Sequence, residues 1–513
     1  RFPNHRVAVL HSGLTAAQRH HQWSLVARGE ADIVLGARSA VFAPVPDDRL
    51  GLIIVDEEHD GSYKQDQTPR YHGRDVAIRR AQLANCPVIL GSATPSLESW
   101  HNAVERESYA LHRMTDRIPG MKLPKVIVVD YLKEKREHAR DDKTDRHVNL
   151  IGTTLQHAIA QTLDRNGQIL LLLNRRGYAN YIACPSSSCG WVMQCEHCDV
   201  TTVYHVNRSL PAGGYVQCHH CLSEQKLPSE CPLCGKKVVP FGLGTQRVEE
   251  ELTRKFPSLI SDKTMLRVDS DTMRTARDYH DALHRFGQGE IKLLVGTQMI
   301  AKGLDYPGVR LVGVINADTA LNLPDFRATE RTFQLVNQVA GRCGRSADIG
   351  VAIVQTFTPE SPAIQLAAAH DFTSFAELEL SQRKRAQLPP YSRMARIVVR
   401  DQDHALANGY ARELAEKLHF VIERTKSEAS ETLAAKSARA SETPSSTTTS
   451  HIRLLGPAPC PISRVADYFR VQIELFAPSA ATLHQFLTVV RREGLLSSSS
   501  SAITVDVDPI ALL

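Results

Sequence analysis

The sequence predicts an α/β protein with two successive parallel-sheet domains, a cysteine-rich insertion in the second of them, and a smaller α+β domain at the C-terminus. Three observations predict this. Short apolar runs alternate with amphipathic segments from residue 6 to about residue 100 and again from residue 151, eight of the eleven cysteines lie in the stretch from Cys184 to Cys234, and the pattern changes beyond about Phe372. Continuous apolar strands separated by helical stretches are typical of parallel sheets buried on both faces.

Composition and charge describe an ordinary globular protein. The 513 residues are 42% hydrophobic and 23% charged, and the net charge of +5 permits nucleic-acid binding without arguing for it. Apolar runs such as Ile169–Leu173 are too short to span a bilayer, and no signal peptide opens the chain, so we expect no membrane partner and a reducing cytoplasm. Because the chain begins at Arg1 in the middle of a fold pattern, we expect its true N-terminus to be missing.

The first domain is expected at residues 1–112. Its predicted strands are Val7–Leu10, Asp32–Leu35, Leu52–Val55 and Val88–Leu90. Ligands of parallel sheets bind at the carboxyl ends of the strands. The segments that follow the last two strands, Asp56-Glu-Glu-His59 and Gly91-Ser-Ala-Thr-Pro95, are therefore the candidate functional turns.

An Asp-Glu pair directly after an apolar strand suits a nucleoside triphosphatase. Asp56 would hold Mg²⁺ against the phosphates, and Glu57 would position the attacking water. Alone, the motif also fits a solvated turn, and Ser92 and Thr94 also fit a tight turn of small residues. Together the two segments resemble motifs II and III of superfamily 2 helicases.

A loop with interleaved aromatic and basic residues lies between these two motifs. It contains Tyr63, Lys64, Arg70 and Tyr71. Tyrosine rings can stack on bases and cationic side chains can pair with phosphates, so the loop is a candidate single-strand-binding element. Two half-buried tyrosines in a surface loop explain the pattern equally well.

The cysteine block, residues 184–234, predicts two zinc sites. Its four short pairs are Cys184/Cys189, Cys195/Cys198, Cys218/Cys221 and Cys231/Cys234. The inner two pairs have the C-x2-C-x19-C-x2-C spacing of a zinc ribbon, which leaves the outer two pairs to form a second site around it. A disulfide cluster does not suit a chain without a secretion signal, and a redox dithiol needs only one Cys-x-x-Cys.

The second domain is expected at residues 113–183 and 235–372, on either side of the cysteine block. A strand that ends at Leu173 leads to Asn174–Gly177 just before the block, and Phe241–Thr245 resumes the fold after it. Downstream, an apolar strand is followed by Gly296-Thr297-Gln298, and a helix ends in Gln338-Val-Ala-Gly-Arg342-Cys-Gly-Arg345. Paired arginines are often a solvated face, but here they could neutralise charge on a γ-phosphate.

The C-terminal domain is expected at residues 373–513. Strands are predicted from Met394 and again near Ile503, and the last residues look like part of the fold. Residues 426–450 are rich in Ser, Thr and Ala, which predicts a disordered insertion, and Ser497–Ser501 predicts a flexible loop.

These motifs together resemble the bacterial primosomal replication-restart helicases, the PriA family. The residues that carry the resemblance are Asp56–His59, Ser62–Gln65, Arg70–His72, Gly91–Pro95, Asn174–Gly177, the eight cysteines, Gly296–Gly303, Asp325–Arg327, Gln338–Arg345 and Asp506–Pro509. They cover nearly the whole chain apart from residues 426–450, and few families place two nested zinc sites inside the second helicase lobe.

The resemblance implies two RecA-like helicase lobes, the first incomplete, and an ATP- and Mg-dependent 3′ to 5′ DNA helicase that restarts replication at abandoned forks. It implies as partners single-stranded and branched DNA, primosome loader proteins, single-strand-binding protein and the replicative helicase. Asp56 and Glu57 would be catalytic, and Gln338, Arg342 and Arg345 would face the nucleotide. Coupling or DNA contact would fall to Ser92, Thr94, Thr297, Gln298 and Lys302.

Three departures from the family pattern stand out. No Gly-x4-Gly-Lys-Ser/Thr phosphate loop occurs, so we expect this chain alone to be unable to hydrolyse ATP. Four residues instead of two separate Cys184 from Cys189, and Cys343 stands where alanine is usual. A non-catalytic, zinc-dependent DNA-binding and helicase-loading scaffold is the main alternative, and a translocase acting on RNA is a weaker one.

Overall fold

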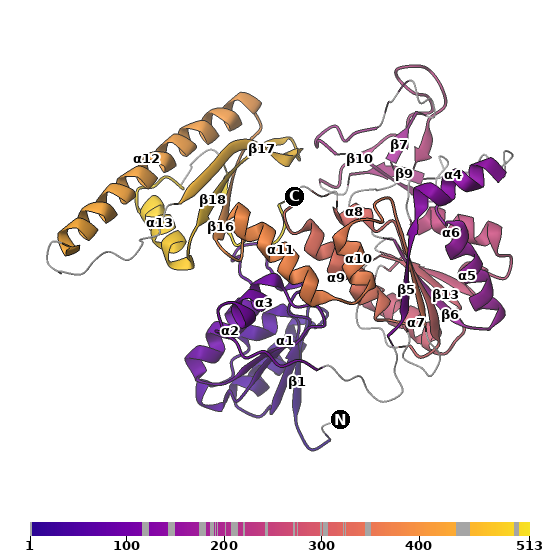
Figure 1. Cartoon of the computed structure of the whole chain (residues 1–513), viewed down its shortest axis with the longest axis horizontal. Coiled ribbons are helices and arrows are strands. Elements are labelled where there is room, and N and C mark those ends of the chain that lie inside the picture. The colour runs from indigo at the N-terminus through magenta and orange to yellow at the C-terminus, as the bar shows by residue number, and fades with distance from the viewer. Residues whose placement is uncertain are drawn as a thin grey trace. The chain divides into compact units, whose positions relative to one another are not determined.

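The structure is a computed structural model, and it divides into two compact units, Arg1–His112 and Arg113–Leu513 (Figure 1). The residues that it describes are 3–114, 123–141, 149–173, 181–184, 189, 191, 193–200, 202–206, 214–218, 221–241, 245–269, 272–273, 275–297, 300, 306–321, 323, 325–343, 350–437, 452–496 and 502–512. Each unit is described by itself.

The first unit contains two short parallel sheets. Strand β1 (Val7–Leu10) pairs with β2 (Ile33–Gly36), and β3 (Ile53–Val55) pairs with β4 (Val88–Leu90). The helices are α1 (Ala16–Ala27), α2 (Gly73–Ala84) and α3 (Leu97–Val104), together with short 3₁₀ turns at Arg38–Phe42, Asp47–Arg49 and Gly61–Tyr63. All four predicted strands are present within one residue of their expected bounds.

The expectation that both faces of this sheet are buried is wrong for the described residues. Leu35, Ile54 and Ile89 are 55%, 64% and 51% exposed, whereas Ala8 and Leu10 pack with Val26 of α1. The apolar runs predicted the strands correctly, but in a strand successive side chains point to opposite faces. A run of apolar residues therefore predicts a strand but does not predict which face of the sheet is covered by other side chains.

The second unit is built on a six-stranded parallel sheet, and this prediction is confirmed. The strand order is β12-β13-β6-β14-β15-β5. The strands are β5 (Lys125–Asp130), β6 (Gln168–Leu173), β12 (Met265–Val268), β13 (Leu293–Gly296), β14 (Val309–Ile315) and β15 (Val351–Thr356). Helices lie in the connections from β5 to β6, β6 to β12, β12 to β13 and β14 to β15, and parallel neighbours require such crossover connections.

Helices cover both faces of this sheet. They are α4 (Tyr131–Asp141), α5 (Thr153–Asp164), α6 (Thr245–Lys255), α7 (Ala276–Gly287), α8 (Asp318–Leu321), α9 (Ala328–Ala340) and α10 (Pro362–Ala368). Along β6, Leu170 and Leu172 face a core with α7, α9 and α10, whereas Leu171 and Leu173 face a core with α5 and α6. Period-two alternation of a fully apolar strand thus gives two separate cores.

The cysteine block leaves the sheet domain between β6 and α6, which confirms the predicted insertion. Strands β7 (Tyr181–Ala183) and β11 (Val239–Phe241) pair at its base. A three-stranded sheet of β8 (Val203–Val206), β9 (Gly214–Gln217) and β10 (Glu224–Gln225) lies between them in the chain.

Helix α11 (Phe372–Ala386) leads into the predicted α+β domain, which is confirmed. Its elements are β16 (Arg393–Asp401), α12 (His404–Ser437), β17 (Arg453–Val465), β18 (Tyr468–Ala477), α13 (Ala480–Arg492) and β19 (Ala502–Val507). The sheet order β17-β18-β16-β19 is antiparallel, which is the β-α-β-β-α-β ferredoxin-like arrangement. Leu418 of α12 and Phe486 of α13 belong to one core with this sheet.

The predicted disordered insertion at 426–450 is wrong at its start, because α12 continues to Ser437. Residues 426–437 lack aliphatic bulk, but they are rich in Ala, Glu and Lys, which favour helix without needing a core. The remainder of that insertion lies outside the described residues, as do Ser497–Ser501. Among the described helices, none is both long and apolar enough to cross a bilayer.

Candidate functional site

In the first unit, backbone hydrogen bonds join the turns after β3 and β4. The amide of Gly91 donates to the carbonyl of Val55 at 2.8 Å, and the amide of Glu58 donates to the carbonyl of Gly91 at 3.1 Å. Glu57 has φ +47°, a left-handed conformation that is uncommon for a glutamate. The Asp56 carboxylate accepts from the Glu57 amide at 3.0 Å, which fixes the turn.

His59 connects the two turns through side chains. Its Nδ1 lies 2.7 Å from the Ser92 hydroxyl, which also accepts from the Thr94 amide at 3.0 Å. The same Nδ1 lies 3.6 Å from the Glu57 carboxylate. A movement of the Glu57 side chain would therefore be transmitted to Ser92 through the imidazole ring of His59. Sequence reasoning named Glu57, Ser92 and Thr94, but it gave His59 no role of its own.

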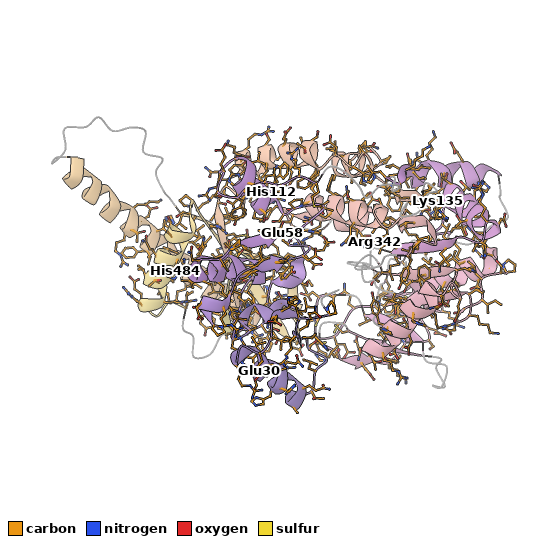
Figure 2. All side chains as sticks on the ribbon, turned by 90° about the horizontal axis from the view of Figure 1, so that it is seen from below. Glu30, Glu58, His112, Lys135, Arg342 and His484 are labelled. Atoms are coloured by element: carbon orange, nitrogen blue, oxygen red, sulfur yellow. The ribbon has the colours of Figure 1, made fainter. Side chains whose placement is uncertain are left out.

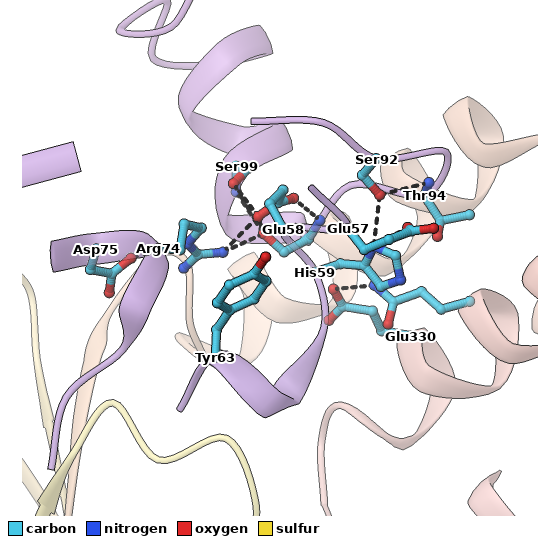
Figure 3. A network of polar contacts seen from close by, with 12 residues as sticks. Glu57, Glu58, His59, Tyr63, Arg74, Asp75, Ser92, Thr94, Ser99 and Glu330 are labelled. Atoms are coloured by element: carbon cyan, nitrogen blue, oxygen red, sulfur yellow. Dashed lines mark hydrogen bonds and ion pairs between the residues drawn. The ribbon is translucent and has the colours of Figure 1, made fainter. Parts of the chain in front are cut away.

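Glu58 is a buried anchor that sequence reasoning missed (Figure 3). Its carboxylate accepts from the amide and hydroxyl of Ser96 at 2.7 and 3.0 Å and from the hydroxyl of Ser99 at 2.9 Å. Arg74 Nη1 donates to the same carboxylate at 3.0 Å and to the Ser96 hydroxyl at 2.6 Å. The sequence did contain a signal for Glu58: it is the third acidic residue in Asp-Glu-Glu, and two carboxylates already suffice to hold the metal and position the water.

Charge around Arg74 stabilises this network. Burial alone would lower the pKa of the guanidinium, but the carboxylates of Asp75, Glu58 and Glu98 outweigh that effect and raise it. Because Ser96 caps the start of α3 and Arg74 lies in the first turn of α2, the Glu58 carboxylate connects the motif II turn to both helices.

The aromatic and basic loop has an inner and an outer part. Tyr63 is half-buried and donates its hydroxyl to the Asp56 carbonyl at 2.7 Å; burial and the nearby Asp56 charge raise its pKa. Lys64 is only 4% exposed, whereas Arg70 is exposed and Tyr71 is half-buried. In this conformation, Lys64 is the innermost and Arg70 the outermost of the four predicted residues of this loop.

Arg38, which follows β2, supports this loop and was also missed. Its guanidinium donates to the carbonyl of Ser62 at 2.8 Å and to acceptors of Lys64 and Gln65. Its charge lies 5.9 Å from the ring centroid of Tyr71, and Phe42 contacts that ring edge-on at 4.8 Å. The position of Arg38 at the carboxyl end of a parallel strand was the signal that could have found it.

The second unit carries the remaining predicted residues. Thr297 directly follows β13, Gln338 lies in the last turn of α9, and Arg342 follows that helix (Figure 2). Gln298, Lys302, Arg345 and Asn174–Gly177 lie outside the described residues. Cys343 is buried with its thiol 3.4 Å from the Val351 carbonyl, and burial raises its pKa to about 12. The Cys343 side chain is thus part of the core of the second unit.

A recess of about 330 Å³ lies at the carboxyl ends of β6, β14 and β15. It is lined by Tyr131, Leu150, Leu173, Ile315, Asn316, Gln355, Thr356 and Phe357. Burial and the charges of Glu251 and Glu134 raise the pKa of Tyr131 to about 12, so its phenol stays neutral.

Eight cysteines come together as the two predicted tetrads. One consists of Cys184, Cys189, Cys231 and Cys234, and the other of Cys195, Cys198, Cys218 and Cys221. In each, the sulfurs all lie within 4.8 Å of one another. The sulfurs of Cys184 and Cys234 are 3.3 Å apart, those of Cys189 and Cys231 3.7 Å, and those of Cys195 and Cys221 3.6 Å. A tetrahedral site with Zn–S bonds of about 2.3 Å needs sulfurs roughly 3.8 Å apart, so both tetrads fit the ion.

Burial and hydrogen bonding act differently on the thiols of the inner tetrad. Burial raises the pKa of Cys198 to about 12. Burial acts in the same direction at Cys221, but hydrogen bonds from Ser223 outweigh it and hold that pKa at about 6. Four close thiols cannot all ionise without compensation, and a divalent cation supplies it.

Comparison with known proteins identifies the family. The model of the "Primosomal protein N C-terminal domain" matches residues 384–510, and that of the "Helicase conserved C-terminal domain" matches residues 225–347. The replication restart protein PriA of Treponema pallidum is 38% identical over 99% of this chain and 69% of its own length. The chain belongs to the PriA family.

PriA relatives from other bacteria agree along the whole chain. The PriA of Bacillus subtilis is 38% identical over 99% of this chain and 58% of its own length, and that of Synechocystis is 37% identical over 100% of this chain and 57% of its own length. The chain thus spans a little more than half the length of these two relatives. The PriA C-terminal match coincides with the ferredoxin-like domain, from the end of α11 to just past β19.

Proposed function

We propose that this chain is the motor and C-terminal portion of an ATP-dependent 3′ to 5′ DNA helicase that recognises abandoned replication forks and initiates primosome assembly. Membership of the PriA family supports this proposal. The single structural observation that carries it is the His59–Ser92 contact of 2.7 Å, which joins the Asp56-Glu57 turn to the Ser92–Thr94 turn. A motor needs such a link between the hydrolysis site and a moving segment.

For hydrolysis, bound Mg²⁺ would bridge the phosphates of ATP and neutralise their charge. Asp56 would hold the ion, and Glu57 would orient the water; both carboxylates lie at the end of β3, where a parallel sheet presents ligands. Gln338, Arg342 and Arg345 would read the nucleotide from the second unit. Thr297, Gln298 and Lys302 would contact the strand or relay the nucleotide state.

For DNA, Arg70 and Tyr71 would contact a single strand by phosphate pairing and base stacking. Tyr63 and Lys64 would position the loop from inside, together with Arg38, since Lys64 is buried and the Tyr63 hydroxyl bonds to the Asp56 carbonyl. A DNA-induced shift of this loop would thereby act on the Asp56 turn. Loader proteins, single-strand-binding protein and the replicative helicase would be the protein partners.

For the cysteine block, we propose two structural zinc ions, one in each tetrad. Four thiolates fill the coordination sphere, so neither ion would retain an open position for catalysis. The ions would stabilise a segment that has only a small core of its own around Ile182 and Val216.

The proposal is tested first by DNA binding of this chain. Forked DNA with a single-stranded arm is expected to bind more tightly than blunt duplex of the same length in fluorescence anisotropy, with an affinity that falls as salt rises. Combined substitution Arg70→Ala/Tyr71→Ala is expected to weaken fork binding by about 10-fold or more. The control is Arg28→Ala, which changes an exposed arginine of the same unit whose side chain pairs with Glu30. Equal binding to fork and blunt duplex would contradict fork recognition.

ATP hydrolysis is tested by supplying a phosphate loop. Because this chain contains none, hydrolysis is expected after fusion to the part of the Bacillus subtilis PriA that lies outside the matched region. In that fusion, Glu57→Gln is expected to lower DNA-stimulated kcat by about 100-fold or more without weakening fork binding, whereas Glu30→Gln has no effect. If Glu57→Gln and Arg342→Ala both leave partner loading at forks intact, the scaffold alternative is favoured over the motor.

A further inference from the structure

The tip of a hairpin in the C-terminal domain reaches the inner cysteine tetrad. Strands β17 and β18 are joined by Ala466 and Asp467, which have φ +51° and +62°. Two successive left-handed residues form the tight turn that matches the twist of a β-hairpin. We call residues 463–468 the tip hairpin.

Backbone groups of the tip hairpin dock on the turn between Cys195 and Asp199. The Asp199 amide donates to the Arg464 carbonyl at 2.9 Å, and the Asp467 amide donates to the His197 carbonyl at 2.8 Å. Between these two bonds, the Ala466 amide donates to the sulfur of Cys198 at 3.1 Å. Three backbone amides therefore hold the hairpin against the ribbon turn, two through carbonyls and one through a cysteine sulfur.

Side chains close the same contact. His197 Nδ1 lies 2.6 Å from the Asp467 carboxylate, and the Arg464 Nε lies 3.3 Å from the Asp199 carboxylate, to which the Ser463 hydroxyl also donates. Val465 packs against the inner cysteines. Cys198 itself is 0% exposed. Water is thus excluded from this sulfur, and an amide of another domain takes the place of a water donor.

The outer tetrad differs in this respect. Among the described residues, the buried and half-buried groups packed with it, such as Ile182, Trp191, Val216 and Val238, come from the segment between β6 and α6. Backbone N–H groups that donate to zinc thiolates withdraw charge from the sulfur and hold it in place, and loss of such a supporting contact typically costs about 10- to 100-fold in metal affinity. Among the described residues, the Ala466 amide of the C-terminal domain donates such a bond to the inner tetrad.

We propose that the tip hairpin is an interdomain lock on the inner zinc site: the metal leaves this site only after the hairpin undocks, and a loaded site holds the C-terminal domain on the cysteine block. This rests on the zinc occupancy proposed above. Because coupling between two binding equilibria is reciprocal, a docked hairpin that raises the affinity of the site for the metal must itself be retained by the bound metal.

The test is zinc transfer from the purified chain to the chromogenic chelator 4-(2-pyridylazo)resorcinol. Val465→Asp places a carboxylate among the thiolates and should undock the hairpin. It is expected to accelerate release of one ion by about 10- to 100-fold and to leave the other unchanged. Ala466→Gly is the matched control, because glycine keeps the amide and accepts the positive φ. Its release rates should equal those of the unchanged protein.

A second variant with a smaller structural change tests the proposal if Val465→Asp fails to fold. Ser463→Ala/Asp467→Gly removes two side-chain contacts and keeps the turn, so release of the same ion should accelerate by a smaller factor. A zinc content of two with unchanged release in both variants overturns the lock. A zinc content below two in the unchanged protein instead contradicts the proposed occupancy, so the two failures are distinguishable.

The reciprocal effect has its own readout. In the loaded protein, trypsin cleavage after Arg464 is expected to be slow, because the carbonyl and side chain of Arg464 are both bonded to Asp199. Stripping the metal with a chelator should accelerate cleavage there, as followed by mass spectrometry. Equal cleavage with and without metal would show that the hairpin is not held by the ion.

Discussion

Arg327 Nη1 donates a hydrogen bond to the carbonyl oxygen of Pro509 at a distance of 3.0 Å, across 182 positions of the sequence. Arg331, one helical turn later, donates to the carbonyl of Ile510 and forms an ion pair with Asp325 at 3.0 Å. Leu512 packs in the same place against Met394 and Phe476. The start of α9, whose other end leads to Arg342, is thus fixed by the last residues of the C-terminal domain.

Arg327→Met is therefore expected to destabilise the second unit. The substitution keeps much of the side-chain volume but leaves the buried Pro509 carbonyl without this donor, at a cost of about 1–3 kcal/mol. Denaturant unfolding followed by circular dichroism measures the change, and hydrogen exchange at residues 510–512 should accelerate. Arg385→Met, at an exposed position on α11, is the matched control. Equal destabilisation by both variants would show that the hydrogen bond from Arg327 to Pro509 does not stabilise the second unit.

A buried ion triad joins α9 to α11, and its disruption should be costlier. Arg383, which is 2% exposed, bonds to Glu330 at 2.8 Å and to Glu379 at 3.0 Å. Arg383→Met leaves two buried carboxylates without their cation, and we expect a loss of about 3–5 kcal/mol in unfolding free energy.

Glu379→Gln should cost much less than Arg383→Met. Burial raises the pKa of Glu379, and the nearby Glu330 adds to this effect against the opposing effect of Arg383, so a neutral side chain here relieves part of the cost of burying a charge. The double variant Arg383→Met/Glu379→Gln should be more stable than Arg383→Met alone. A double-mutant cycle measures this coupling, and strict additivity would exclude it.

Glu58→Gln is expected to loosen the network behind the motif II turn. The amide side chain cannot accept four hydrogen bonds as the carboxylate does, and Arg74 loses its buried counter-ion, although Asp75 and Glu98 remain nearby. We expect the first unit to lose about 2 kcal/mol or more in denaturant unfolding, read from the fluorescence of buried Trp100. Glu30→Gln changes an exposed surface pair and should stay within about 0.5 kcal/mol (Figure 2).

The sequence predicted elements and motifs well because their causes are local. Apolar runs predicted β6 and β13, and cysteine spacing predicted both tetrads, since a tight turn determines which sulfurs can share an ion. Contacts across long separations could not be predicted. Neither Arg327 with Pro509 nor Ala466 with Cys198 leaves a signal in local pattern or spacing, because each pairing depends on how two domains meet.

Buried polar partners were missed for a related reason. Glu58 and Arg38 read as surface charges in a one-dimensional pattern, since charged residues are rarely buried unless paired. Their pairing with Ser96 and Ser62 appears only when parallel strands bring separate turns to one edge. For Lys64, the composition of the loop suggested a phosphate contact, whereas its side chain is buried in this structure.

His72 should make the first unit acid-sensitive. Burial lowers its pKa to about 4, helped by Arg74 and Lys64 and opposed by Asp75 and Glu98. Its buried Nδ1 has no hydrogen-bond partner among the described residues. In the unfolded chain a histidine titrates near about 6.5.

The direction of the pH dependence of stability follows from these two pKa values. Between pH of about 6.5 and the folded pKa of about 4, the unfolded state binds a proton that the folded state does not, so stability falls as pH decreases through this window. The difference between about 6.5 and about 4 corresponds to about 3 kcal/mol at most. Above pH of about 7 the effect vanishes, because both states are neutral there.

His72→Phe removes the titrating group and keeps an aromatic ring, so it should flatten part of this dependence. We expect the unfolding free energy of the first unit to fall between pH 7 and 5 by about 1 kcal/mol less in the variant than in the unchanged protein. His112→Phe, at an exposed position of the same unit, should leave the slope unaltered (Figure 2). Parallel pH profiles for the unchanged protein and His72→Phe would mean that protonation of this ring does not oppose folding.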